Sequence, residues 1–216
     1  MSADQTQTLE RIRESLTDGQ VSELRELVRI ALDEGLGPEQ VLNDGMIAAM
    51  SALGEQFQRE EIYLPEVLFA ARAMLAGMQI LEPLLAGAGI EPLAKVALGT
   101  VKGDIHDIGK NLVGIMLKGA GFEVIDLGID VPPEGFVEAA RQGARLIGMS
   151  ALTSGTMVAL QPVITALEEA GLKGEIKTMV GGAIVTQAYA ASIGADGYAE
   201  DAVAAVAKAK QLLGLS

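Results

Sequence analysis

Hydrophobic residues in the first 87 positions recur at the three- and four-residue spacing that is typical of α-helices. One apolar stripe covers residues 24–31, and another covers residues 9–16. Gly37-Pro38 and Leu64-Pro65 each place a proline where a further helix would begin. The pattern predicts a small all-α bundle of about four helices, joined by short turns.

After a break rich in small residues near 86–92, expected strands alternate with expected helices. The strands are expected at 95–101, 123–127, 145–149, 175–180 and 197–198, and the helices at 108–118, 133–142, 157–170, 186–192 and 201–213. This alternation predicts a flavodoxin-like (Rossmann-like) α/β fold, with a five-stranded parallel sheet in the order 2-1-3-4-5. The expected domains are a helical domain at 1–87, a linker at 88–94 and an α/β domain at 95–216.

Composition excludes several classes of function. The chain has no cysteine, so it can form neither a disulfide framework nor a thiolate metal site. A net charge of −13 and 3% aromatic residues argue against nucleic-acid binding, because phosphate contacts need Lys and Arg. We find no uninterrupted apolar run of about 18–20 residues and no secretory signal, and therefore expect a cytoplasmic protein that binds no membrane.

The unusual residues of the α/β half lie in the expected strand-to-helix loops, which all emerge at one edge of a parallel sheet. His106 is the only histidine of the chain and lies in the first of these loops. The loop at 150–156 is dense in hydroxyl groups, Gly181-Gly182 follows the fourth strand, and residues 198–201 follow the fifth. Caps and tight turns explain each feature alone, whereas together they favour one large ligand.

The residues around His106 narrow the chemistry. Asp104 would repel the pyrophosphate of a dinucleotide, and no nucleophile elbow surrounds Ser150. A metal held by one histidine would lack ligands unless a macrocycle supplied the others. A single imidazole, oriented by a carboxylate and followed by Gly109, fits a metal whose other ligands come from a macrocycle.

These residues resemble a family signature. The Asp-x-His-x-x-Gly pattern of residues 104–109, the Ser-x-Leu of 150–152 and the Gly-Gly of 181–182 look like the cobalamin-binding module. The N-terminal helices resemble the cap domain that accompanies this module in methionine synthase and in small corrinoid proteins of anaerobic methyltransferase systems. The resemblance extends from about residue 10 to the end of the chain.

The resemblance implies a cobalamin carrier that is not catalytic alone. It would shuttle a methyl group from a substrate-specific methyltransferase to an acceptor methyltransferase that uses tetrahydrofolate or a thiol. Its cobalt would cycle between Co(I) and methyl-Co(III), and a reductive activator would rescue the oxidised cofactor. Specificity for the methyl donor (methanol, methylamines, quaternary amines or methoxylated aromatics) would lie in the partner enzymes.

The resemblance also implies roles for individual residues. His106 would be the lower axial cobalt ligand, and Asp104 would accept the other N–H of its imidazole. Further cofactor contacts would come from Asp107, Ile108, Gly109, Ser150, Leu152, Ser154, Gly181, Gly182, Tyr198, Glu200 and Asp201. In the cap, Phe57, Leu64 and Val67 would cover the upper face of the corrin, although their spacing alone would indicate ordinary bundle core.

Three other functions remain open. A cobalamin-binding subunit of a coenzyme-B12-dependent mutase would share the histidine loop but would not need the helical cap. A cobalamin-based sensor would need a DNA-binding region, for which this acidic chain offers no candidate. A cofactor-free two-domain scaffold is the remaining alternative.

Overall fold

The computed structural model describes residues 2–88 and 91–215 and divides into two compact units. The main segment of the first unit ends at Glu91, and that of the second begins at Pro92. The expected linker at 88–94 spans this point, and its residues 89 and 90 lie outside the described residues. Acidic residues are concentrated in the first segment, which holds 16 of the 29 acidic and 6 of the 16 basic residues.

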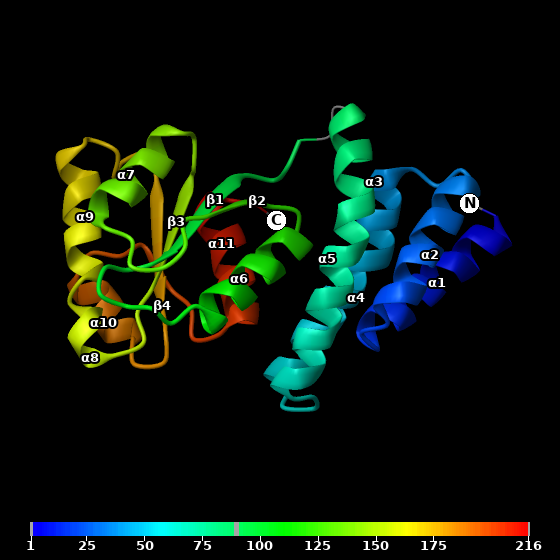
Figure 1. The fold of residues 1–216 in the computed structure, drawn as a ribbon, viewed down its shortest axis with the longest axis horizontal. Coiled ribbons are helices and arrows are strands. Elements are labelled where there is room, and N and C mark those ends of the chain that lie inside the picture. Colours follow the sequence, from blue (N-terminus) through cyan, green and yellow to red (C-terminus); the bar gives the residue numbers. More distant parts are fainter. Residues whose placement is uncertain (1, 89–90, 216) are drawn as a thin grey trace. The chain divides into compact units, whose positions relative to one another are not determined.

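The first unit is entirely helical, as the sequence predicts (Figure 1). Its elements are α1 (Ala3–Thr17), α2 (Val21–Asp33), α3 (Pro38–Gln40), η1 (Val41–Ile47), α4 (Ala48–Gln58) and α5 (Leu64–Gly87). The first helix begins six residues earlier than predicted because Ser2 caps it. The Ser2 hydroxyl accepts the N–H of Gln5, and the Gln5 side chain accepts the N–H of Ser2.

The segment η1 is a π-helix within the helical run that follows Pro38, where the sequence predicted ordinary α-helix. The Arg13 side chain donates to the backbone carbonyl of Asp44 in this segment, at 2.8 Å. A Cβ added at Gly45 would lie 3.0 Å from Ile12 of α1, and one at Gly77 of α5 would lie 2.5 Å from Met46. Glycines therefore allow both neighbouring helices to approach η1 closely.

The helix α5 corrects one expectation from the sequence. Its residues Leu64–Leu85, with a mean hydropathy of 1.3, are long and apolar enough to cross a membrane. Half of that segment is nevertheless buried inside the protein, and Ala70, Ala71 and Met74 are fully buried. Its apolar character is that of a core helix in this bundle.

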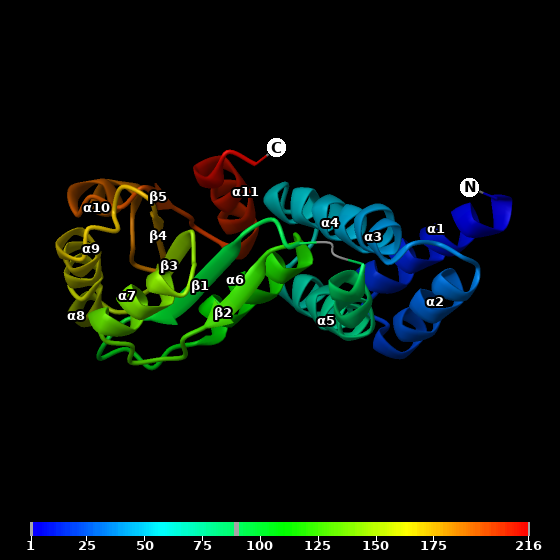
Figure 2. The same ribbon diagram turned by 90° about the horizontal axis from the view of Figure 1, so that it is seen from above.

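The second unit is a parallel sheet with helices on both faces, as predicted. Its strands are β1 (Lys95–Thr100), β2 (Glu123–Asp126), β3 (Leu146–Ser150), β4 (Lys177–Gly181) and β5 (Gly197–Tyr198), in the order β2-β1-β3-β4-β5. Figures 1 and 2 show α7 (Pro133–Arg141), α9 (Leu160–Glu169) and α10 (Gln187–Ser192) on one face, and α6 (Ile108–Gly119) and α11 (Ala202–Leu213) on the other. Phe136 and Leu167 are among the buried residues that pack between the first group and the sheet.

The helix predicted at 157–170 is two helices. A short helix α8 (Ser154–Met157) begins after Thr153, whose side chain accepts the N–H of Thr156. The helical conformation is interrupted between α8 and α9. At the end of α8, the Tyr189 hydroxyl donates to the carbonyl of Met157 at 2.9 Å. The cap at Thr153 therefore starts the first helix three residues before the predicted position.

A partly buried polar cluster joins β4 to the loop before β5. The Asp196 carboxylate accepts hydrogen bonds from the N–H and hydroxyl of Thr178, at 2.8 and 2.7 Å, and from Lys173 Nζ at 3.0 Å. Burial alone raises the pKa of Asp196, but these hydrogen bonds outweigh it, and the pKa lies below the ordinary value.

We predict that Asp196→Asn lowers the free energy of unfolding at pH 7 by about 2 kcal/mol, because an uncharged amide oxygen replaces the carboxylate and accepts weaker hydrogen bonds from Thr178 and Lys173. Since the pKa of the native carboxylate is depressed, its contribution is present above the unfolded pKa of about 3.9 and is lost as the pH falls through the native pKa. Urea unfolding at several pH values should therefore show the wild type and D196N converging below about pH 4. The exposed Glu168→Gln serves as control, and an equal gap at all pH values would contradict the prediction.

Candidate functional site

The register of the sheet aligns the ends of three strands. Thr100 of β1 pairs with Ser150 of β3, and Ser150 pairs with Gly181 of β4. The loops that follow these strands therefore leave the same edge side by side, as the sequence predicts. This edge carries the candidate site.

Asp104 is the centre of the site. Its side chain is fully buried and accepts four hydrogen bonds: from the N–H and the Nδ1 of His106 at 3.0 and 2.7 Å, from the N–H of Leu152 at 2.8 Å, and from the Thr156 hydroxyl at 2.5 Å. Burial alone raises the pKa of Asp104, but these donors lower it well below the ordinary range. Asp104 is therefore an ionised carboxylate that joins the loops after β1 and β3.

The ionised Asp104 fixes the state of His106. Because a carboxylate only accepts, the Nδ1 of His106 must carry a proton, and the lone pair of a neutral ring then lies on Nε2. The side chain of His106 is 51% exposed. The hydroxyl of Thr100, itself fully buried, donates to the His106 carbonyl at 2.9 Å and holds the loop against the strand. The result is one oriented imidazole nitrogen directed away from its buried partner.

Exposed apolar side chains accompany this imidazole. Ile105 and Ile108 are 70% and 75% exposed, although large aliphatic side chains are usually buried. Others with exposed surface lie in the segments that follow β2, β3 and β4: Ile129, Leu152, Val158 and Ile184. Exposed aliphatic side chains in several loops of one sheet edge suit a large ligand with apolar faces.

Gly181 and Gly182 allow the loops to approach one another. A Cβ at Gly182, where φ is +126°, would lie 2.0 Å from the carbonyl oxygen of Ala151. A Cβ at Gly181 would lie 2.9 Å from the carbonyl oxygen of Ala199. The glycine pair thus brings the loops after β3 and β5 against the end of β4.

The start of α6 is held by side-chain contacts. The buried Lys110 Nζ donates to Asn111 Oδ1 at 2.7 Å and to Asp126 Oδ1 at the end of β2. Asn111 in turn donates to the exposed Asp107 at 3.0 Å. A Cβ added at Gly109 would meet no protein atom within 4 Å, so space is open at this point.

The other predicted residues of the α/β unit lie around the same edge. Ser150 and Tyr198 are half-buried, and Ser154 and Glu200 are exposed. Asp201 caps α11 by accepting the N–H of Ala204 at 2.7 Å, which gives it a structural role. Their proposed contacts with a cofactor remain predictions.

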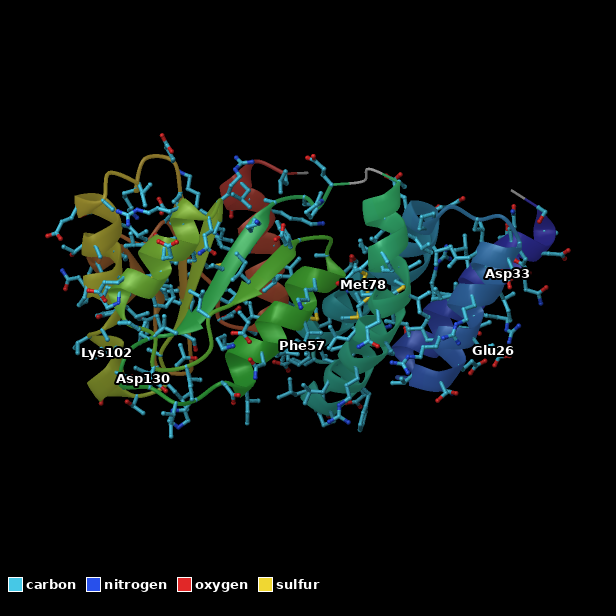
Figure 3. All side chains as sticks on the ribbon, turned by 45° about the horizontal axis from the view of Figure 1, so that its top comes forward. Glu26, Asp33, Phe57, Met78, Lys102 and Asp130 are labelled. Carbon is cyan, nitrogen blue, oxygen red and sulfur yellow. The ribbon has the colours of Figure 1, made fainter. Side chains whose placement is uncertain are left out.

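The three cap residues differ in exposure. Phe57, labelled in Figure 3, is half-buried at the end of α4, and Leu64 is 44% exposed where α5 begins. Val67 is 1% exposed. Phe57 and Leu64 are therefore the more accessible candidates, and the proposed contact of all three residues with a cofactor remains a prediction.

Sequence reasoning missed Thr156 and Ile105. Thr156 lies in the same hydroxyl-rich run as the predicted residues Ser150 and Ser154, but its partner Asp104 is 52 positions away. Ile105 looks like ordinary core in the sequence, and only its exposure identifies it.

The side chains available as ligands indicate what kind of metal site could form here. Within residues 2–88 and 91–215, no three His, Cys, Asp or Glu side chains are grouped as metal ligands. A metal ion at His106 would therefore need its equatorial ligands from an organic ring. One available imidazole nitrogen beside exposed aliphatic side chains fits a metal macrocycle.

Comparison with known proteins agrees with this chemistry. Two families, both described as "B12 binding domain", match residues 94–207 and residues 8–82. The dimethylamine corrinoid protein 2 of Methanosarcina mazei is 45% identical over 95% of this chain and 99% of its own length. The trimethylamine corrinoid protein 1 of the same organism is 41% identical, over 98% and 99%. A chain in the methanol:cobalamin methyltransferase complex MtaBC from Methanosarcina barkeri has a TM-score of 0.86 at 29% identity, covering 97% of this chain and 81% of that one.

Thr156→Val removes one donor to the buried Asp104 carboxylate and the contacts of the Thr156 hydroxyl with the N–H and hydroxyl of Thr153. We predict a decrease of about 2 kcal/mol in the free energy of unfolding of the ligand-free protein, measured in urea. Thr156→Ser keeps the hydroxyl and should recover most of this loss. Equal destabilisation by both variants would mean that the methyl group, and not the hydrogen bond, matters at this position.

Proposed function

Because the chain belongs to the family of B12-binding corrinoid proteins, we propose that it is a corrinoid carrier, which receives a methyl group from one methyltransferase and presents it to another. The observation that carries this proposal is the Asp104–His106 pair, with its available Nε2 beside exposed aliphatic side chains. A bound corrinoid would supply methyl transfer at its cobalt, which would alternate between Co(I) and methyl-Co(III).

The protein would bind and orient the cofactor. His106 Nε2 is the proposed lower axial ligand, and the Asp104 carboxylate keeps Nδ1 protonated so that Nε2 stays available. The open space at Gly109 would accept part of the displaced nucleotide tail. Further proposed contacts with the tail come from Asp107, Ile108, Ser150, Leu152, Ser154, Gly181, Gly182, Tyr198, Glu200 and Asp201.

The helical unit would exclude water from the upper face of the corrin. Phe57 and Leu64 are the proposed cover, because both keep accessible surface in their own unit. The match of residues 8–82 to a B12 binding domain supports a carrier over a mutase subunit, whose chemistry does not need such a cap.

A carrier of this kind requires partners. We propose a substrate-specific methyltransferase, an acceptor methyltransferase with tetrahydrofolate or a thiol as acceptor, and a reductive activator, all in the cytoplasm. Relatives named for dimethylamine and trimethylamine make methylated amines the first donors to test.

The test of the carrier proposal is cofactor retention. Hydroxocobalamin is mixed with the wild type and with His106→Ala, and the proteins are desalted and their visible spectra recorded. We expect the wild type to retain the cofactor with a histidine-ligated spectrum that H106A lacks. We expect H106A to bind at least tenfold more weakly, in line with losses of about 10–100-fold when the surroundings of a metal ligand are altered. If the wild type retains no corrinoid, either as purified or after refolding with it, the proposal is wrong.

The cover is tested by the pair Leu64→Ala and Val67→Ala. We predict that L64A changes the free energy of unfolding by less than about 0.5 kcal/mol but speeds the exchange of cyanide onto bound hydroxocobalamin severalfold. V67A should instead lower the free energy of unfolding by about 2 kcal/mol, because it removes buried methyl groups, and should leave the exchange rate unchanged. Faster exchange in V67A alone would contradict this assignment.

A further inference from the structure

Asp130, in the loop between β2 and α7, has an unusual backbone conformation. Its φ is +53°, in the left-handed region that residues other than glycine seldom adopt. Among the described residues, Glu60 is the only other non-glycine residue with a positive φ. Asp130 is exposed, so burial of its side chain does not explain the conformation. Such backbone persists where surrounding contacts determine it, and it is often found at functional sites.

The contacts of Asp130 are with the backbone of the His106 loop. Its Oδ1 accepts the N–H of Gly103 at 2.7 Å, and its own N–H donates to the carbonyl of Asp104 at 3.0 Å. One residue therefore holds both ends of the Gly103–Asp104 segment. Figure 3 labels Asp130 at the edge of the α/β unit where this loop lies.

Neighbouring backbone bonds fix the position of Asp130 itself. The N–H of Val131 donates to the carbonyl of Thr100 at 2.9 Å, and the N–H of Thr100 donates to the carbonyl of Gly128 at 3.0 Å. The β2–α7 loop is thus anchored to β1 on each side of Asp130. The left-handed conformation directs the Asp130 N–H and carboxylate toward the adjacent loop rather than along its own strand.

We infer that Asp130 is a positioning residue for the Asp104–His106 pair. By holding the backbone of Gly103 and Asp104, it sets where the Asp104 carboxylate meets His106 Nδ1. What the orientation serves rests on the proposed function. The orientation itself is a property of the protein without cofactor.

The single histidine makes the orientation measurable. In ¹⁵N-labelled protein without cofactor, the two ring nitrogens of His106 are the only imidazole signals, and their shifts report which nitrogen carries the proton. The spectra are recorded at a pH where imidazole is neutral. For the wild type we expect one form, protonated on Nδ1.

Three substitutions separate the acceptor from the backbone conformation. Asp130→Asn keeps an oxygen acceptor and tolerates a positive φ, so it should preserve the wild-type tautomer. Asp130→Gly relieves the backbone strain but removes the acceptor, and Asp130→Ala removes the acceptor and retains the strain. We expect both D130G and D130A to show averaging between the two tautomers and about tenfold weaker retention of hydroxocobalamin.

Glu134→Ala, at an exposed acidic residue in the first turn of α7, is the matched control and should behave as the wild type. Thermal unfolding shows that each variant is folded under the conditions of the NMR measurement. Wild-type tautomers in folded D130G and D130A would overturn the inference, and so would tautomer averaging in D130N. Failure of the wild type to retain hydroxocobalamin would reject the proposed function, whereas the tautomer result would still decide the role of Asp130.

Discussion

The buried carboxylate of Asp104 is the interaction on which the rest of the site depends. An ionised carboxylate in a protein interior is unfavourable unless hydrogen bonds replace its water, and here donors from two loops do so. The same donors are the groups whose positions matter: the His106 ring, the backbone at Leu152 and the first helix after β3. Solvation of one charge thereby organises the edge of the sheet.

The edge around this charge also carries exposed aliphatic side chains, in a chain whose net charge is −13. Ile105 and Ile108 are exposed on either side of His106 in the sequence, at positions where a polar side chain would cause no steric conflict with the protein. Their retention at the surface is explained if a ligand covers them. The site therefore combines one directional bond, from the imidazole, with apolar contacts that have little directional preference.

Most of the fold could be predicted from periodicity and turn residues, including the strand order and the helical unit. The π-helical turn η1 and the break between α8 and α9 could not, because contacts from other helices and from Tyr189 accompany them. In the site, His106 and Asp104 could be found because the chain has no other histidine and the two are only two positions apart in the sequence. Thr156 and the exposure of Ile105 depend on tertiary placement, which spacing does not reveal.

The order of the strands also has a consequence for folding. The sheet places β1 between β2 and β3, so a long loop must close before β3 can pair with β1. Asp104 receives its partners at Leu152 and Thr156 only after β3 has paired with β1. During synthesis, the histidine loop is therefore made before the partners that orient it exist. A chain cut short before β3 would contain every residue of the Asp-x-His-x-x-Gly motif and still lack an oriented imidazole.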